Sequence, residues 1–175
     1  MKQKVKIYRD SIYAFLPQKG SKHAVGFDLR ADLSSLAYED FKKKLKDPIE
    51  VCKFKDFLFN FFLVLPPQEV KVLPTGLKLE LPKDMELDIK SRSGLFSKNG
   101  ILVQGTIDPD YRGEIRIMMM NLGKEELKIF HGDRLAQGVF RKVYNQDDLF
   151  IEVQDEEELS LTSRNQKGFG STGIK

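Results

Sequence analysis

The sequence has few of the features that define several classes of protein. Its 175 residues include one cysteine, Cys52, so the chain cannot form an intramolecular disulfide, which is typical of a reducing compartment. The formal net charge of +3 is too small to indicate direct nucleic-acid binding. The most apolar run, residues 57–65, is far shorter than the roughly 20 residues of a membrane-spanning helix. These features predict a cytoplasmic protein that binds neither membranes nor nucleic acid.

Histidine is scarce as well. His23 and His131 are far apart and have no partners at the spacing of metal ligands. We therefore expect structural roles for both side chains, and no cage of protein ligands around a metal ion.

The overall composition is that of an ordinary globular protein. Hydrophobic residues make up 41% of the chain and charged residues 31%. The length suits a single domain over residues 1–175, and the sequence has no internal repeat and no interdomain linker.

Short segments of alternating apolar and polar residues dominate the chain. They are separated by proline and glycine, which is typical of antiparallel strands. The alternating segments are residues 5–7, 77–81, 87–90, 115–119 and 127–129. We also expect the apolar run 57–65 to form a buried strand. So many short strands predict an all-β fold, either a sandwich, a barrel or a jelly roll.

One segment has a helical pattern instead. Tyr38, Phe41 and Leu45 recur at helical spacing, with lysines on the opposite face. This pattern predicts one short helix that ends near Asp47 and Pro48.

The C-terminal segment 164–173 has a composition suited to binding phosphate. It offers one fixed cation, three glycines, two hydroxyls and one aromatic ring. A chain terminus of this kind cannot build a core, but it can close over an anionic ligand when that ligand binds. The residues concerned are Arg164, Gly168, Phe169, Gly170, Ser171, Thr172 and Gly173.

Three internal segments carry further candidate site residues. Ser91–Leu95 follows a strand and combines Arg92 with two hydroxyls and a glycine, which suits an oxyanion but also an ordinary surface turn. Segment 132–140 places an uncharged amide, Gln137, in an apolar stretch, either as an edge-strand residue or as a donor to phosphate.

The segment 105–117 is the most specific of the three. It packs Asp108, Asp110 and Tyr111 into a tight turn between two apolar strands, so we expect a hairpin. In a functional interpretation Asp108 orients and deprotonates a water, and Tyr111 offers a flat apolar face to a base or sugar. The alternative is a hairpin without a catalytic role.

Together with Ala24–Ala31, these segments resemble, in order and spacing, the five motifs of the trimeric dUTPase family. The resemblance covers residues 5–173, apart from an insertion at about 34–57. It implies a jelly-roll-like, distorted-barrel subunit, a homotrimer with interfacial active sites, and a flexible C-terminal arm at about 159–175. The implied reaction converts dUTP and water to dUMP and pyrophosphate, with Mg²⁺ on the triphosphate.

The resemblance also implies roles for individual residues. Asp108 corresponds to the water-activating carboxylate, and Tyr111 to the residue that stacks under deoxyribose. The hairpin backbone, including Gly105, Thr106 and Ile107, would read uracil, and Asp28 would lie near the water shell of the metal. The residues implied for the α- and β-phosphates are Arg92, Ser93, Gly94 and Gln137. Those implied for the γ-phosphate and for covering the uracil are Arg164, Gly168, Phe169, Gly170, Ser171 and Thr172.

The chain departs from the family pattern at three places. Asn165 and Lys167 stand where glycines are common in the arm. Family members often carry Asn or Gly just before the hairpin, whereas this chain has the run Leu102–Gly105. The third departure is the insertion, which we interpret either as an elaborated strand connection or as a contact for a partner protein or another subunit.

Two other functions compete with dUTP hydrolysis. A dCTP deaminase shares many of these sequence motifs. It needs a catalytic glutamate on the strand after the hairpin, where this chain has Met118. A regulatory nucleotide-binding protein that acts through the insertion would not need Asp108, Tyr111 and Arg164 intact.

Overall fold

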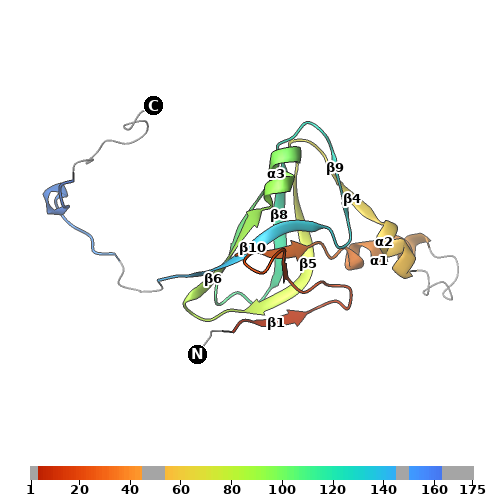
Figure 1. The fold of residues 1–175 in the computed structure, drawn as a ribbon, viewed down its shortest axis with the longest axis horizontal. Coiled ribbons are helices and arrows are strands. Elements are labelled where there is room, and N and C mark those ends of the chain that lie inside the picture. Colours follow the sequence, from red (N-terminus) through yellow and green to blue (C-terminus); the bar gives the residue numbers. More distant parts are fainter. Residues whose placement is uncertain (1–3, 45–53, 145–149, 163–175) are drawn as a thin grey trace. The chain divides into compact units, whose positions relative to one another are not determined.

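The computed structural model describes residues 4–44, 54–144 and 150–162 (Figure 1). The chain divides into two units, residues 1–144 and 145–175. The elements of the first unit are β1 (Lys6–Arg9), β2 (Gln18–Lys19), β3 (Phe27–Arg30), α1 (Ser34–Lys44), α2 (Phe54–Asn60), β4 (Phe62–Leu65), β5 (Val70–Glu80), β6 (Met85–Ser91), α3 (Ser93–Asn99), β7 (Ile101–Ile107), β8 (Glu114–Asn121), β9 (Leu127–Phe130) and β10 (Arg134–Lys142).

Eight strands of the first unit form one antiparallel sheet. Their order is β1-β5-β8-β7-β6-β10-β3-β2. The alternation that predicts the strands also decides which face each residue occupies. On β8, for example, Ile115, Ile117 and Met119 are buried while Arg116 and Met118 are exposed. The first unit is therefore mostly β, as the strand pattern predicts, although it also contains helices.

The sheet curls around a single hydrophobic core. Leu29 of β3 and Leu135 of β10 belong to the same buried cluster as Leu77 of β5 and Ile117 of β8, although these strands lie far apart in the sheet order. A separate ribbon of β4 and β9 contributes Leu65 and Ile129 to this core.

The prediction of one helix is wrong, because the described residues contain three α-helices. Helix α1 confirms the helix predicted around Tyr38 and Phe41, and its predicted end near Asp47 and Pro48 lies outside the described residues. Helix α3 occupies a segment that we interpreted as a turn. Gly100 ends it with a φ of 69°, and its N–H bonds back to the helix. Among the described residues, no helix has the length and apolar character needed to span a membrane.

The expectation of a buried strand over residues 57–65 is also wrong. Its first part is helix α2, which buries Phe54 and Leu58, one helical turn apart. The Asn60 side chain donates to the Asp56 carbonyl at 2.8 Å near the end of this helix. The strand β4 follows, and of its residues Leu65 alone is buried. The phenylalanines hid the helical spacing because they suit either structure.

Helices α1 and α2 pack on each other and have a small core of their own (Figure 1). This cluster consists of Ala37, Phe41, Phe54 and Leu58, and the rings of Phe41 and Phe54 meet edge to face at 5.5 Å. The insertion predicted at about 34–57 is therefore, in its described part, a folded helical pair.

A buried polar pair joins this insertion to the sheet. His131 follows β9, and its Nδ1 accepts a hydrogen bond from the Leu33 backbone N–H at 3.2 Å. The Asp32 carboxylate lies 3.5 Å away and accepts the Ser34 N–H at the start of α1. Phe15 and Phe59 pack against the imidazole. Burial lowers the pKa of His131 below its ordinary value, and the Asp32 charge only partly opposes this shift.

The described part of the second unit contains a short 3₁₀ helix, Glu156–Glu158. The Asp155 side chain caps it by accepting the Glu157 N–H. Phe150, Ile151 and Leu161 are exposed within this unit.

Candidate active site

The register of three strands places Asp28, Gln137 and Lys90 side by side. Gln137 on β10 pairs with Asp28 on β3 and with Lys90 on β6. These residues come from segments far apart in the sequence, so only the sheet topology brings them together. Two of them, Asp28 and Gln137, are predicted site residues.

Asp28 is the centre of a cationic cluster. It is 8% exposed, and its Oδ1 accepts from Arg92 Nε at 3.1 Å while its Oδ2 accepts from Arg134 at 3.4 Å. Arg92 also donates to the Arg134 backbone carbonyl at 3.1 Å, which ties the two arginine segments together. Two guanidinium groups share one carboxylate, so the cluster keeps a net positive charge and several free N–H donors.

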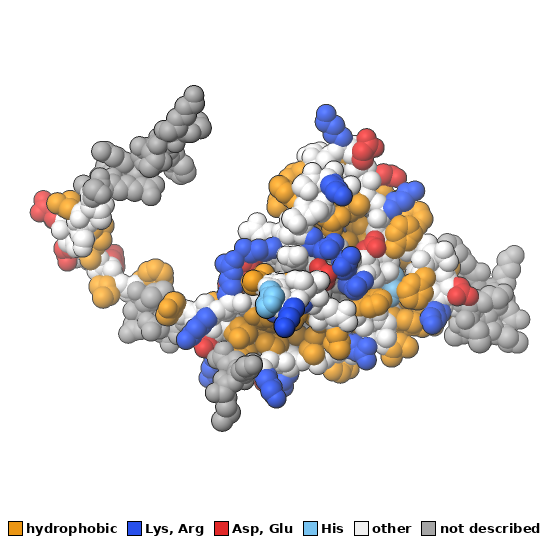
Figure 2. Space-filling view, viewed as in Figure 1, with side chains coloured by type: hydrophobic (Ala, Val, Ile, Leu, Met, Phe, Trp, Pro, Cys, Tyr) orange, Lys and Arg blue, Asp and Glu red, His pale blue; other side chains and the backbone are white. Residues whose placement is uncertain are grey.

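The surface beside this cluster is open. Ser93 and Gly94 follow Arg92 and are exposed, and a side chain added at Gly94 would meet no atom within 4 Å. Basic side chains also gather on this face in Figure 2, over the region where Figure 1 shows β6 and β10. An anion can therefore approach Arg92, Ser93 and Gly94 directly.

Gln137 depends on a glycine of the first predicted motif. A Cβ at Gly26 would lie 3.2 Å from the Gln137 Cβ and Oε1 atoms, closer than side chains normally pack. Gly26 therefore makes room for the Gln137 amide beside Asp28.

The predicted hairpin consists of β7, β8 and the connecting loop 108–113. The Asp108 side chain is exposed, and its backbone carbonyl accepts the Tyr111 N–H at 3.2 Å. The Tyr111 hydroxyl donates to the Glu114 carbonyl at 3.0 Å. The loop thus holds Asp108 and Tyr111 on one short, internally bonded turn, with the carboxylate facing solvent.

The two strands of this hairpin separate before they reach the loop. Their pairing runs from Ile101 with Asn121 to Val103 with Met119, and it stops there although both strands continue. Beyond that point β7 stays paired with β6 on its other side, through Gly105, Thr106 and Ile107. The backbone between Val103 and Ile107 therefore has an edge toward β8 that the sheet does not use.

The hairpin and the cationic cluster lie at opposite ends of β6. Ile107, next to Asp108, pairs with Leu87, and Arg92 is five residues further along the chain. At about 3.4 Å per residue, this corresponds to roughly 17 Å along the strand. Within one chain, Asp108 and Arg92 do not form a common site.

The predicted site residues of the C-terminal segment lie outside the described residues. They are Arg164, Gly168, Phe169, Gly170, Ser171 and Thr172. Within the described residues, no group of three or more His, Cys, Asp or Glu side chains could hold a metal ion. Asp28, engaged by two arginines, fits only the indirect role that Mg²⁺ allows, because this ion keeps waters and binds substrate phosphates.

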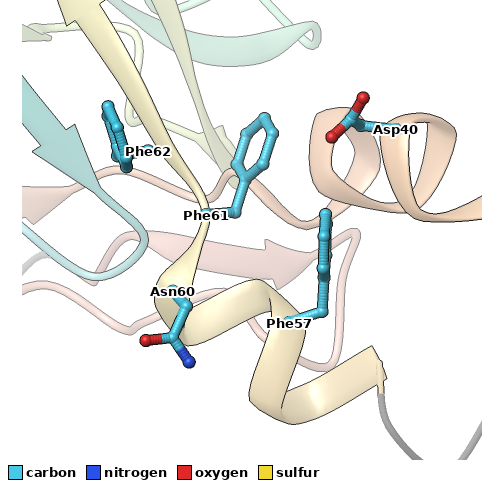
Figure 3. Close-up of a pocket in the computed structure, with 5 residues that line it drawn as sticks. All are labelled: Asp40, Phe57, Asn60, Phe61 and Phe62. Atoms are coloured by element: carbon cyan, nitrogen blue, oxygen red, sulfur yellow. The ribbon is translucent and has the colours of Figure 1, made fainter. Parts of the chain in front are cut away.

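A separate hollow of about 260 Å³ lies on the insertion and the start of β4 (Figure 3). Its lining residues are Asp40, Phe57, Asn60, Phe61 and Phe62. None of them is a predicted site residue. In the close-up, the Phe57 and Phe61 rings lie on the side toward α1, whereas the Asn60 amide points away from it.

Comparison with known proteins decides the family. The dUTPase family model matches residues 60–173, which include the hairpin, Arg92 and Gln137. The chain belongs to the dUTPase family. The deoxyuridine 5'-triphosphate nucleotidohydrolase of Treponema denticola is 38% identical over 164 residues, covering 92% of each chain. That of Clostridium novyi is 46% identical over 115 residues, covering 64% of this chain and 78% of the relative.

Solved dUTPases have the same fold. The dUTPase of Staphylococcus bacteriophage 80alpha, solved with dUPNHPP, matches with a TM-score of 0.74 at 21% identity over 99% of this chain and 100% of its own. A dUTPase variant from phage phi11 of S. aureus, solved with a structural Mg(II) ion, matches with a TM-score of 0.65 at 20% identity, over 88% and 99% of the two chains.

The structure adds two candidate site residues that the sequence did not single out. Arg134 shares Asp28 with Arg92, and Glu114 bonds to Tyr111 through its carbonyl. Both stand inside segments that were already of interest. Their charge was visible in the sequence, but their partners were not.

Proposed function

We propose that this protein hydrolyses dUTP to dUMP and pyrophosphate. The observation that carries the proposal is the Asp108–Tyr111 loop, at the end of a hairpin whose strands have separated, within the part of the chain that matches the dUTPase family. Through this reaction the enzyme would limit uracil incorporation into DNA and supply dUMP for dTMP synthesis.

Asp108 is the proposed general base. Its exposed carboxylate orients a water molecule and accepts a proton as the water oxygen bonds to the α-phosphorus. The bond from that phosphorus to the oxygen bridging the α- and β-phosphates breaks, and pyrophosphate leaves with the bonding electrons. A rigid turn suits this role, because the position of the water depends on the position of the carboxylate.

The separated strands provide the proposed uracil site. The unused backbone edge of Gly105, Thr106 and Ile107 can pair with the polar edge of a base, and such pairing rejects bases with a different donor pattern. The Tyr111 ring would stack against the deoxyribose and disfavour a 2'-hydroxyl.

The cationic cluster is the proposed phosphate cradle. Arg92, Ser93, Gly94 and Gln137 would bind the α- and β-phosphates, and Arg134 adds a second guanidinium. Bound Mg²⁺ would neutralise part of the triphosphate charge, with Asp28 close to its water shell. The predicted clamp on the γ-phosphate and the cover over uracil come from Arg164 and from residues 168–172, which lie outside the described residues.

A homotrimer with shared sites completes the proposal. Asp108 and the cradle lie about 17 Å apart along β6, so the hairpin of one subunit needs the cradle of another. An apolar patch of Val70, Val72, Leu102 and Met118 is exposed on neighbouring strands β5, β8 and β7. A patch of this kind on one face of a sheet suits a subunit contact.

We also infer one functional domain over residues 1–175, with an insertion at 34–57 and an arm at 159–175. A cytoplasmic location belongs to the proposal and is supported by the single cysteine.

Pyrophosphate release from dUTP, dCTP, dTTP and UTP with Mg²⁺ tests the function. Strong selectivity for dUTP is expected. Ammonia release from dCTP would instead support a deaminase, and inactivity toward all four nucleotides would favour a regulatory role for the insertion.

Asp108→Asn tests the general base. The amide keeps the size of the side chain but cannot accept the proton, so kcat should fall by at least about a hundredfold while dUTP binding changes little. An unchanged kcat would remove Asp108 from this role. Asp110→Asn, in the same loop, is the matched control.

A further inference from the structure

Strand β5, which pairs with β8 of the hairpin, has an irregular segment opposite the start of β8. Pro74 pairs with Arg116 and Lys78 with Glu114, so the register shifts by two residues between them. The shift accommodates Thr75, Gly76 and Leu77, all buried. Backbone groups in such a bulge lack regular ladder partners and must find others.

Glu114 supplies one of these partners. Its Oε1 accepts the Gly76 N–H at 2.7 Å, a short, charge-assisted hydrogen bond. The Glu114 side chain is only 20% exposed, and its other oxygen lies 3.5 Å from Arg116 Nε. Thr75 closes the other side of the bulge by donating to the Ile115 carbonyl at 2.6 Å. The first residues of β8 are thus fixed to the bulge by side chains as well as by the ladder.

Gly76 itself cannot easily be replaced or moved. Its φ of 66° is in the left-handed region, and a Cβ there would lie 2.4 Å from Asp32 Oδ2. The group that Glu114 holds is therefore a rigid part of the core.

The backbone of the same glutamate holds Tyr111. The Tyr111 hydroxyl donates to the Glu114 carbonyl at 3.0 Å, and a Cβ at Gly113 would lie 2.3 Å from the hydroxyl oxygen. The ring therefore folds back tightly over the chain at Gly113. Any shift of Glu114 moves the carbonyl oxygen that accepts the hydrogen bond from the Tyr111 hydroxyl.

We propose that Glu114 is a positioning residue for the reaction. Its carboxylate anchors the start of β8 to Gly76, and its carbonyl fixes the Tyr111 ring at the angle needed to meet the sugar. The inference rests on the proposed dUTP hydrolysis. It adds that selection against the 2'-hydroxyl depends on a residue that does not contact the nucleotide.

The test compares kcat and KM for dUTP and UTP in wild type, Glu114→Ala and Glu114→Gln. Removing the acceptor should lower the ratio of kcat/KM for dUTP over UTP by about tenfold, mainly through the KM for dUTP. The glutamine keeps an oxygen that can accept the Gly76 N–H, so it should stay within about threefold of wild type. Glu80→Ala is the control, because Glu80 pairs with Lys6 on the surface and is 48% exposed.

Each outcome bears on the proposal. A lower melting temperature for Glu114→Ala with an unchanged dUTP-to-UTP ratio would mean that Glu114 only stabilises the fold, and would overturn it. Equal damage by glutamine and alanine would also overturn it. If Glu114→Ala does not fold, Glu114→Asp shortens the side chain by one methylene and should show the same loss of selectivity. A wild-type protein with no dUTP hydrolysis would refute the proposed function itself, before any variant is compared.

Discussion

We predict that the buried imidazole of His131 makes the stability of this protein sensitive to mild acid. The neutral ring accepts the Leu33 N–H through Nδ1, and its Nε2 has no hydrogen-bond partner among the described residues. A proton added at Nδ1 would break that hydrogen bond and set the new N–H of the ring against the Leu33 N–H. Among the described residues, Asp32, 3.5 Å away, favours the charged form, and burial outweighs it.

The sign and size of the effect follow from linkage. In the unfolded chain the pKa of histidine is about 6.5, whereas in the folded state the pKa of His131 is lower. Below pH 6.5 the unfolded state therefore binds a proton that the folded state does not. The free energy of unfolding falls as the pH falls, until the pH reaches the folded pKa. If His131 stays neutral throughout, the loss between pH 7.5 and 5.5 reaches its upper limit of about 1.4 kcal/mol.

Chemical denaturation at a series of pH values measures this loss. The chain concentration must be fixed, because subunit assembly changes apparent stability. In His131→Asn, the amide oxygen can still accept the Leu33 N–H but does not titrate. The variant should be less stable at pH 7.5, through lost packing against Phe15 and Phe59, yet should lose less stability than wild type on acidification, by up to about 1.4 kcal/mol.

The exposed His23 provides the matched control. His23→Gln should keep the full pH dependence of wild type, since the side chain has solvent around it in the folded state. If His131→Asn retained the same pH dependence as wild type, or if His23→Gln removed it, the assignment to His131 would be refuted.

Two further predictions concern the C-terminal segment and the α1–α2 helical pair. Deleting the residues after Ser163 should leave an assembled protein of unchanged circular dichroism with greatly reduced dUTP hydrolysis; loss of the fold would instead make the C-terminal segment structural. Leu58→Ala empties part of the α1–α2 core, where Leu58 is 0% exposed, and should lower the free energy of unfolding by about 2–5 kcal/mol without changing kcat. Leu36→Ala, on the same helical pair but 42% exposed, should cost about 0.5 kcal/mol or less.

The strands were predictable because their pattern is local. On β8 the alternation of Ile115, Ile117 and Met119 with Arg116 and Met118 fixes both the strand and its buried face. The hairpin was predictable for the same reason, since its turn residues stand between two alternating segments. The roles proposed for Asp108 and Tyr111 came from the resemblance to the dUTPase family, because the turn by itself also fits a hairpin without a catalytic role.

The helices beyond α1 were harder. In α2, Phe54 and Leu58 mark a helical face, but the surrounding phenylalanines fit a strand equally well. Helix α3 is short and all its side chains are at least partly exposed, so its sequence has no apolar periodicity that predicts a helix.

The partners of the site residues could not be predicted because they depend on long-range register. Asp28 meets Arg92 across 64 residues of sequence and Arg134 across 106. The bond between Glu114 and Gly76 exists only because β5 shifts its register opposite β8. The sequence supplies the charges, and the sheet order decides which of them meet.

The pairing of Asp28 with two arginines has a consequence for how the enzyme meets its substrate. The carboxylate acts as a built-in stand-in for phosphate, since it holds both guanidinium groups in place before any nucleotide arrives. Ordering a long side chain at a binding site costs about 0.5–1.5 kcal/mol, and here much of that cost is met when the chain folds. If Arg92 and Arg134 bind the triphosphate as proposed, Asp28 has already positioned their guanidinium groups before the nucleotide binds.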